Sequence, residues 1–307
     1  MATYLIVREK RPIPQTILYN NLTAYICGGI DSISLFSGSD FAKQKYSNLR
    51  ISIFTFRPMP HISAVIITKN QEQKIGRTID ALKILTDDIV VVIDSDSIDQ
   101  TEAIAAQKGA RVFRKQWEGY SLQKNFGNRQ AKHRWVLSID DDEVVSDELA
   151  ANIKAAFEVE PGFDAFDLPF RTVFCGKLIK FGGWNPEAHV RLFDKTKIEW
   201  NTDAVHEGLT LKPEHQIQKL NGYVYHYTVD SVEQFYAKTD RYSTLFAQKG
   251  AFFGKKAPFY KIYFSPIFRF LSEYIFRFGF LDGRYGYIIA KDNARYTYLK
   301  YKKLSRL

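Results

Sequence analysis

The chain has 307 residues, of which 45% are hydrophobic and 25% charged, and its formal net charge is +9. This composition excludes a chain that is disordered throughout, and the length allows one large domain or two modest ones. The two cysteines, Cys27 and Cys175, lie far apart, which argues against a disulfide framework or a zinc ribbon and is typical of a reducing compartment. Because the N-terminus also lacks the features of a secretory signal, we expect a cytoplasmic protein.

The first 58 residues mix polar and aromatic side chains without a clear period. A segment of this length without staples buries little core, so we expect a poorly structured leader, or an upstream stretch included through a misassigned start. We divide the rest of the chain into a main domain over residues 59–230 and a helical extension over residues 231–307.

Buried strands and helices alternate from residue 62 onward. The continuous apolar runs at Ile62–Asn70 and Ile89–Asp94 predict strands buried on both faces, and Ile75–Leu85 has apolar residues at helical spacing. The same alternation continues with a helix over 99–108, a strand over 110–114, a helix over 122–131 and a strand over 135–140. This order predicts an α/β fold with a mostly parallel central sheet and helices on both faces.

Polar clusters follow three of these strands: Thr68 to Asn70, Asp94 to Ser97, and Asp140 to Glu143. Ligands bind beyond the carboxyl ends of the strands in such sheets, so we expect one site built by three loops. A strand-end aspartate such as Asp94 is, taken alone, more often a turn former.

Four consecutive acids, from Asp140 to Glu143, repel one another unless a cation neutralises them. In a strand or tight turn Asp140 and Asp142 point the same way and Asp141 points oppositely, so two carboxylates can share one metal. Hard oxygen ligands favour Mg²⁺ or Mn²⁺. The alternative is that the acids cap the following helix, a task that Ser146 could perform without them.

The C-terminal part is aromatic and basic. After short strand-like runs from Asp164, the chain turns helical at Ser231, and residues 255–307 contain twelve Lys/Arg and three Asp/Glu. The apolar stretch over 258–281 is interrupted by four charged residues and is too short to span a bilayer. We predict a helix beginning at Ser265 and Pro266, which either packs on the main domain or lies in a membrane interface. For the surrounding basic residues we expect an anionic membrane surface or a phosphorylated acceptor as partner.

Several of these segments together resemble family 2 glycosyltransferases with the GT-A fold, in the bacterial group that includes the lipopolysaccharide core β-glucosyltransferases. The segments are ISAVIITKN, IDSDSIDQTEAIA, GYSLQKNFGNRQA, WVLSIDDDE, GGWNPEAHVRLF, WNTDAVHEGL, YHYTVDSVEQFYAKTDRYS and FGFLDGRYGY. The resemblance covers about residue 60 to the end of the chain.

The resemblance assigns donor and metal positions by residue. It implies that the nucleotide pocket is lined by Thr68 and Asn70, that Asp94 holds the base, and that Asp140 contacts ribose and sugar while Asp142 binds the metal. Further positions beside the nucleotide are Asp96, Lys124 and Asn125, with a solvent-facing helix lysine as the alternative for Lys124. In the second motif Asp96 replaces a glycine of the family, and an aspartate there could reshape the loop or weaken the site.

The remaining roles concern the acceptor. An inverting transfer needs a general base, for which the resemblance favours Glu207, with Asp203 and Glu143 as alternatives. Glu207 could instead be a structural partner of Arg191, which we also consider for acceptor binding. Two more residues complete the candidates, each with a structural alternative: Trp184 as a stacking platform or core residue, and His226 as a third metal ligand or structural histidine.

We therefore expect an inverting transferase that moves a hexose, glucose foremost, from a UDP-sugar to a glycolipid such as lipopolysaccharide inner core. It would use Mg²⁺ or Mn²⁺ and act as a peripheral protein on the inner face of the cytoplasmic membrane, and no nucleic acid partner is expected. One alternative is a sugar nucleotidyltransferase, although the glycine-rich basic loop of that class is missing. The other is a catalytically weak or inactive protein that binds membrane surfaces or anionic ligands.

Overall fold

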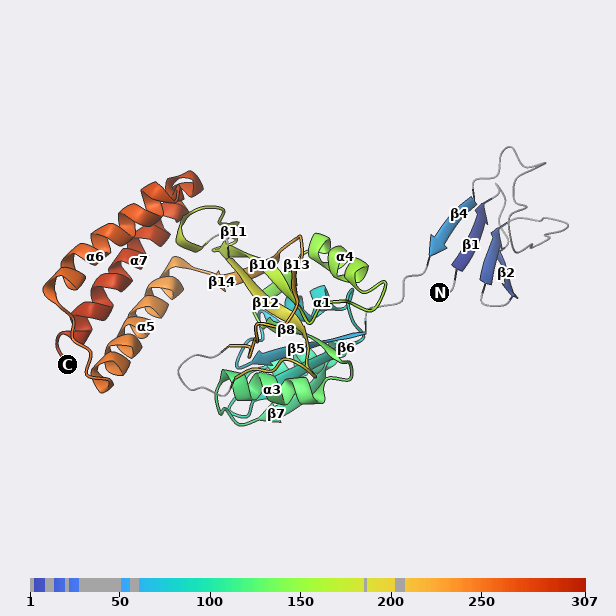
Figure 1. Ribbon diagram of the computed structural model, residues 1–307, viewed down its shortest axis with the longest axis horizontal. Helices are drawn as coiled ribbons and strands as arrows, with labels where there is room; N and C mark the ends of the chain where they lie inside the picture. Colours follow the sequence, from blue (N-terminus) through green and yellow to red (C-terminus); the bar gives the residue numbers. More distant parts are fainter. Residues whose placement is uncertain are drawn as a thin grey trace. The chain divides into compact units, whose positions relative to one another are not determined.

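The computed structural model describes residues 61–184, 187–201 and 208–307 together with the backbone of four strands among the first 60 residues. The chain divides into two compact units, residues 1–59 and residues 60–307 (Figure 1). In the first unit the described strands form one sheet in the order β2-β3-β1-β4. Their bounds are Thr3–Arg8 for β1, Pro14–Tyr19 for β2, Leu22–Cys27 for β3 and Ile51–Thr55 for β4. Our division of the chain at residues 58 and 230 stays a prediction.

The second unit is built on a ten-stranded sheet in which β7-β6-β5-β8 are parallel neighbours. These strands are β5 (Ile62–Thr68), β6 (Asp88–Asp94), β7 (Arg111–Lys115) and β8 (Trp135–Asp140). Every residue of β5 and β6 is buried, as the continuous apolar runs predicted. Ile67 lies opposite both Val92 and Asp140, so the carboxyl ends of the three strands meet at one edge.

A mixed part extends this sheet from β8 through β12, β10, β14 and β9, in which β10 and β14 are parallel and the other neighbours are antiparallel. The strands are β12 (Glu187–Asp194), β10 (Ala165–Phe174), β14 (Val224–Val229) and β9 (Glu143–Val145), while β11 (Lys177–Leu178) and β13 (Ile217–Lys219) pair with β10. The pairing of β14 with β9 sets His226 opposite Glu143. A residue far along the chain is thereby brought beside the acid segment.

Helices cover both faces of the sheet (Figure 1). On one face α1 (Ile75–Leu82), α2 (Thr101–Gln107) and α4 (Asp147–Ala156) bury apolar side chains against alternate residues of β5 and β6. On the other face lies α3 (Tyr120–Gln130), where a Cβ at Gly127 would overlap Val65 of β5. The Ser146 side chain caps α4 by accepting a hydrogen bond from the Leu149 N–H, so the acids of the strand end are not needed as caps.

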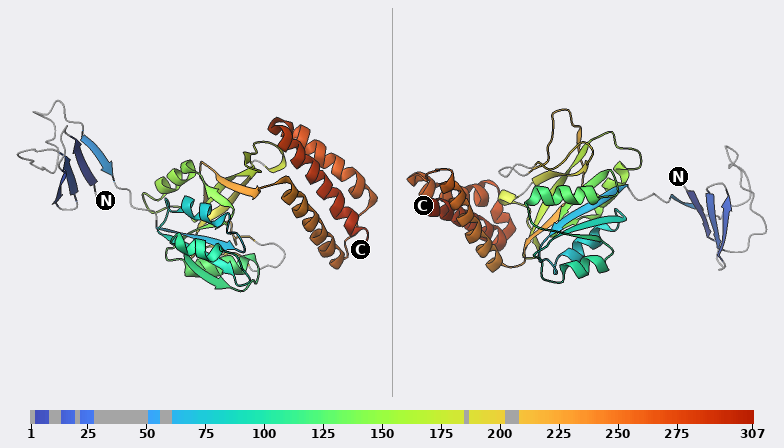
Figure 2. Two further views of the ribbon diagram at one scale, coloured as in Figure 1. Left: turned by 180° about the vertical axis from the view of Figure 1, so that it is seen from behind. Right: turned by 90° about the horizontal axis from the view of Figure 1, so that it is seen from below.

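The last part of the chain folds into three long helices, α5 (Val232–Phe252), α6 (Phe259–Leu271) and α7 (Gly283–Leu304), which lie side by side in Figure 2. A π-helical turn, η2 (Ser272–Phe276), and a 3₁₀ turn, η3 (Gly279–Asp282), connect α6 to α7. The predicted helix start at Ser265 is wrong, because α6 begins at Phe259 after Pro258 and contains Pro266 in its interior. Pro266 has no backbone N–H, so the helix lacks one hydrogen bond there, and the packing of α6 along α7 offsets this loss. Among the described helices, we find none with the length and apolarity that crossing a membrane requires.

The three helices are joined to the sheet at the hairpin that follows β10. Phe174, Ile179 and Val229 form a core cluster with Phe235 of α5 and with two isoleucines of α7. The buried Asp282 carboxylate accepts hydrogen bonds from the backbone N–H groups of Lys180 and Phe181, the latter at 2.8 Å. The helices are therefore fixed to the hairpin by both apolar and polar contacts.

Candidate active site

The acid segment begins with Asp140, the last residue of β8. Its carboxylate accepts a hydrogen bond from Lys124 Nζ of α3 at 2.8 Å and another from Arg191 Nη2 of β12 at 3.2 Å. Burial opposes ionisation, but the charges of Lys124 and Arg191 hold the pKa of Asp140 well below its usual value. Asp140 is therefore a fixed carboxylate between two cations, with its side chain 35% exposed.

Glu143 supports this arrangement from inside the protein. Its side chain is 2% exposed and accepts hydrogen bonds from the Asp140 N–H at 2.8 Å and from Arg191 Nη2 at 3.3 Å. Burial, together with the Asp140 charge, raises the pKa of Glu143. Because Glu143 is buried and contacts both Asp140 and Arg191, its role here is to position those two residues.

Asp142 contacts His226 and not the two cations. The distance from His226 Nε2 to Asp142 Oδ1 is 3.4 Å, and the Tyr227 N–H donates to the Asp142 carbonyl at 2.9 Å. Although burial acts to lower it, the pKa of His226 is raised by the hydrogen bond and charge of Asp142. The pairing of β9 with β14 produces this contact.

Asp141 lies in an environment that disfavours its charge. Burial, with a contribution from the charges of Asp142 and Asp140, raises the pKa of Asp141 to about 7, while the Thr68 hydroxyl opposes the rise. The carbonyl of Asp141 accepts a hydrogen bond from the Thr78 hydroxyl at 2.9 Å. Burial therefore makes Asp141 more readily neutral than an ordinary aspartate.

The described residues fit a metal that takes part of its ligands from a substrate. In that part of the chain, no three His, Cys, Asp or Glu side chains are grouped as a complete metal site. Asp142 and His226 lie in contact with each other and offer two candidate ligands, and Asp141 precedes Asp142 in the chain. Mg²⁺ is commonly bound by one or two carboxylates together with substrate phosphates, and Asp142 supplies one such carboxylate.

Asp94, at the end of β6, is covered by a lysine. It is 2% exposed and accepts hydrogen bonds from Lys69 Nζ at 2.7 Å and from the Asp96 N–H at 3.1 Å. The hydrogen bond from Lys69 is the main cause that lowers the pKa of Asp94. The Lys69 side chain is itself 44% exposed, so the ion pair lies between the buried carboxylate and solvent.

Asn70 ties the loops after β5 and β6 together. Its N–H donates to Ser97 Oγ at 2.8 Å, and its side-chain oxygen accepts from the Ile98 N–H at 2.9 Å. Asn70 has a φ of 52°, in the left-handed region that asparagine tolerates. Asp96 is not among the described residues with positive φ, so the aspartate that replaces the family glycine causes no backbone strain there.

A cavity of about 700 Å³ opens beside the two cations that flank Asp140. Its lining includes Lys124, Arg191, Trp200 and Gly208. The Lys124 ammonium lies 4.5 Å from the centre of a Trp200 ring, which shows that the lysine is not a solvent-facing helix residue. The lining of the cavity thus includes two cations and an indole, together with the acid Asp167 and several aliphatic side chains.

Asn125, a candidate for nucleotide contact, is engaged with the backbone of Trp200. Its amide donates to the Trp200 carbonyl at 2.8 Å and accepts from the Trp200 N–H at 3.0 Å. The next residue, Asn201, exchanges hydrogen bonds with Gly208, because its N–H donates to the Gly208 carbonyl at 2.8 Å and its side chain accepts from the Gly208 N–H. Asn125 therefore fixes the segment that leads into residues 202–207.

The two candidates for the general base, Asp203 and Glu207, lie outside the described residues. Gly208, the residue that follows Glu207 in the sequence, lines the cavity. Trp184 is half-buried and packs against Phe174 and Phe235, with ring centres 5.9 and 5.5 Å away. That packing favours the core alternative for Trp184.

The structure adds two residues to the site that we did not single out from the sequence, Lys69 and Trp200. Both stand within segments that carry the family resemblance, Lys69 between Thr68 and Asn70 and Trp200 at the start of WNTDAVHEGL. Position within those motifs was the available signal. Their contacts with Asp94 and Lys124 depend on the folded arrangement.

Among solved structures, the chain is similar to a crystal structure of residues 1–349 of TarS from Staphylococcus aureus. The TM-score is 0.41 and the identity 18%, over 60% of this chain and 65% of the other. It is also similar to the mannosyltransferase PcManGT from Pyrobaculum calidifontis in complex with GDP-Man and Mn²⁺. There the TM-score is 0.43 and the identity 15%, over 63% of this chain and 64% of the other. In both cases the chain spans slightly less than two thirds of the other protein's chain.

The model of glycosyl transferase family 2 matches residues 63–204. A protein of Rickettsia typhi described as an uncharacterised glycosyltransferase is 32% identical over 260 residues, 81% of this chain and 87% of that protein. The lipopolysaccharide core biosynthesis glycosyltransferase LpsC of Rhizobium meliloti is 30% identical over 263 residues, 80% of this chain and 93% of that protein. These matches confirm the resemblance noted from the motifs: the chain belongs to glycosyl transferase family 2 and is a glycosyltransferase with the GT-A fold.

Proposed function

We propose that this glycosyltransferase moves a hexose, glucose foremost, from a UDP-sugar to a glycolipid of the lipopolysaccharide core type, with inversion and with Mg²⁺ or Mn²⁺. The similarity to LpsC supports the acceptor class. The observation that carries the proposal is the carboxylate of Asp140, held between Lys124 and Arg191 beside a cavity of about 700 Å³. The cations can pair with the diphosphate of a sugar nucleotide, and the fixed carboxylate can accept hydrogen bonds from its hydroxyl groups.

In the proposed donor site, Thr68, Asn70, Asp94 and Asp96 hold the nucleotide. Asn70 joins the two loops that would enclose it, and Asp94 would accept a hydrogen bond from the base once Lys69 has moved aside. Lys124 and Arg191 would offset the charge of the diphosphate while Asp140 binds hydroxyl groups of ribose and sugar. Asn125 would act through Trp200, whose indole forms a wall of the same cavity.

Asp142 and His226 would hold the metal together with the diphosphate of the donor. When bound, it supplies positive charge that stabilises the leaving diphosphate. We expect Asp142→Ala to lose metal-dependent binding of UDP, measured by calorimetry with and without Mn²⁺. Asp147→Ala, an exposed acid in the first turn of α4, is the matched control and should bind as the parent does. Unchanged binding in Asp142→Ala would contradict the metal assignment.

The general base of the proposal is Glu207, which takes the proton from the attacking acceptor hydroxyl. Glu207→Gln keeps the size of the side chain and removes its basicity, so transfer should be abolished while donor binding is retained. Asp203→Asn is the matched variant for the alternative base. If Glu207→Gln turns over at a near-normal rate and Asp203→Asn does not, the role belongs to Asp203.

A screen of sugar nucleotides tests the function as a whole. The purified chain is incubated with UDP-glucose, UDP-galactose, UDP-N-acetylglucosamine and GDP-mannose, each with Mn²⁺, Mg²⁺ or EDTA, and release of the nucleotide is measured with and without lipopolysaccharide core acceptor. We expect release from UDP-glucose that requires metal and is stimulated by the acceptor. Release that is insensitive to EDTA, or restricted to GDP-mannose, would overturn the proposed donor and metal.

The proposed place of action is the inner face of the cytoplasmic membrane, where the protein would be peripheral. A glycolipid acceptor is anchored in a bilayer, so the enzyme must reach that surface. The basic C-terminal helices are the part of the chain whose charge suits an anionic membrane.

A further inference from the structure

The helix α6 exposes an apolar face where a helix of a soluble domain usually exposes a polar one. Phe264 is 62% exposed and Phe268 is 69% exposed. Side chains at positions i, i+4 and i+8 lie on one side of a helix, and the exposed apolar residues of α6 form two adjacent rows with this spacing. The exposed apolar residues of α6 are Phe259, Tyr260, Tyr263, Phe264, Ile267, Phe268 and Leu271.

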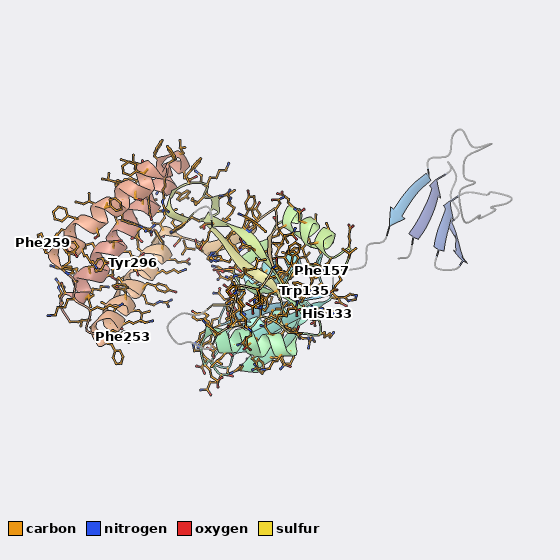
Figure 3. All side chains as sticks on the ribbon, viewed as in Figure 1. His133, Trp135, Phe157, Phe253, Phe259 and Tyr296 are labelled. Carbon is orange, nitrogen blue, oxygen red and sulfur yellow. The ribbon has the colours of Figure 1, made fainter. Side chains whose placement is uncertain are left out.

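The exposed apolar surface continues past the end of α6 through the two turns that lead to α7. Its members there are Ile275, Phe276, Phe278, Phe280 and Leu281, each at least 44% exposed. Phe278 has a φ of 57°, a left-handed conformation that aromatic residues rarely adopt, although its side chain is 55% exposed. The Phe278 side chain thus faces outward, while the neighbouring Gly279 and Asp282 of the same turn are buried. We name residues 259–281 the docking face; Figure 3 labels Phe259 at its start.

The charge around the docking face has one sign. Residues 251–281 contain five Lys/Arg, which are Lys255, Lys256, Lys261, Arg269 and Arg277, and a single acid, Glu273. Glu273 is 2% exposed and pairs with Arg269, so no exposed carboxylate lies in this segment. A second copy of the chain would bring the same positive charges to a symmetric interface, where they would repel. An anionic surface is the complementary partner.

A groove runs beside the docking face along the line where α6 meets α7. Its volume is about 490 Å³, and its lining includes Ile262, Phe270 and Ala294. The two charged side chains of the lining, Lys291 and Arg295, are both basic. An apolar groove with basic neighbours has the chemistry of a bilayer boundary, where acyl chains lie below anionic headgroups.

We propose that the docking face lies in the interface of a bilayer that contains anionic phospholipid, with its aromatic side chains at the boundary between headgroups and acyl chains. The lysines and arginines around it contact the headgroups through their long side chains. The proposal names the surface partner of the function proposed above and rests on that function for its purpose. Vesicle binding needs no sugar nucleotide, however, and nucleotide release on a soluble core acceptor needs no vesicle, so the two proposals fail separately.

The test is co-sedimentation of the full chain with vesicles of phosphatidylcholine alone or mixed with phosphatidylglycerol. We expect binding to the mixed vesicles and much weaker binding to phosphatidylcholine alone. Phe264→Glu combined with Phe268→Glu should lower partitioning on the order of 100-fold, because two aromatic side chains no longer enter the apolar layer. The matched control, Tyr242→Glu with Leu245→Glu, changes two exposed apolar residues of α5 and should bind within about threefold of the parent.

A charge variant separates the two parts of the interaction. Lys255→Ala with Lys256→Ala should weaken binding to phosphatidylglycerol vesicles roughly 30-fold and leave the weak binding to phosphatidylcholine unchanged. All the changed side chains are exposed, so each variant should fold as the parent does. Circular dichroism checks this. Equal binding by the phenylalanine variant and its control would overturn the proposal. The proposal would also be overturned if the parent chain does not bind vesicles and forms a dimer, while the phenylalanine variant stays monomeric. The docking face would then bind a second copy of the chain.

Discussion

The double hydrogen bond between Asn125 and the backbone of Trp200 allows a sharp prediction for Asn125→Ala. Both residues are 8% exposed, and the two bonds are 2.8 and 3.0 Å long. The substitution removes two hydrogen bonds worth about 1 kcal/mol each and leaves a buried N–H and a buried carbonyl without partners. We therefore expect the free energy of unfolding to fall by about 2 to 4 kcal/mol.

Urea unfolding followed by circular dichroism measures this change. The matched control is Asn128→Ala in the same helix, because Asn128 is 6% exposed and its side-chain oxygen has no hydrogen-bond partner in the described part of the protein. The control should lose less than about 1 kcal/mol. A loss in Asn125→Ala no larger than in the control would refute the reasoning, and weaker UDP binding at undiminished stability would show that Asn125 contacts the nucleotide directly.

Two further predictions concern stability. Asp88 has no exposed side-chain surface and pairs with Arg111 at 2.7 Å; although burial opposes it, hydrogen bonds and the Arg111 charge lower the pKa of Asp88. A carboxylate with a lowered pKa stabilises the folded state at pH values above its unfolded pKa of about 3.9, and this stabilisation is lost as the pH falls. In urea unfolding, Asp88→Asn should therefore lower the free energy of unfolding by about 3 kcal/mol at pH 7 and by clearly less at pH 3. An equal loss at both pH values would contradict this reasoning. Gly183→Ala would place a Cβ on the Glu273 carboxylate and should lower the free energy of unfolding by about 1 to 3 kcal/mol. In thermal melting, the double variant Gly183→Ala with Glu273→Ala should lose less stability than the sum of the two single losses. Strict additivity would argue against the contact.

The parallel part of the sheet could be predicted from the sequence because its signal is local. The buried run at Trp135–Asp140 was predicted with the bounds of β8, and Ile62–Asn70 differs from β5 only by two polar residues at its end. Continuous apolar stretches bounded by polar clusters leave few alternatives to a strand covered on both faces. The prediction for α6 failed because Ser265 and Pro266 form a good local helix start, whereas packing on α7 continues the helix through them.

The site was predictable only where one segment carries it. The acids from Asp140 to Glu143 indicate a cation by themselves, but Asp140 meets Lys124 and Arg191 only because α3 packs on β5, the neighbour of β8, and β12 pairs with β8. The contact between Asp142 and His226 likewise depends on the long-range pairing of β9 with β14. No local pattern encodes such a pairing. The roles of Asp203 and Glu207 stay predictions that rest on the family resemblance.

The junction between the hairpin after β10 and the C-terminal helices has a mechanical consequence. Asp282 holds the backbone of Lys180 and Phe181, and the Gly182 N–H donates to the Arg277 carbonyl at 2.9 Å. A flexible linker would let the catalytic sheet tumble above whatever surface the helices rest on, and its reach would vary with linker length. A short junction with this many hydrogen bonds instead transmits orientation, so the depth of insertion of the helices would set the height of the sugar-transfer site above the surface. Acceptors would then be selected by how far their reactive hydroxyl stands from the bilayer as well as by their chemical structure.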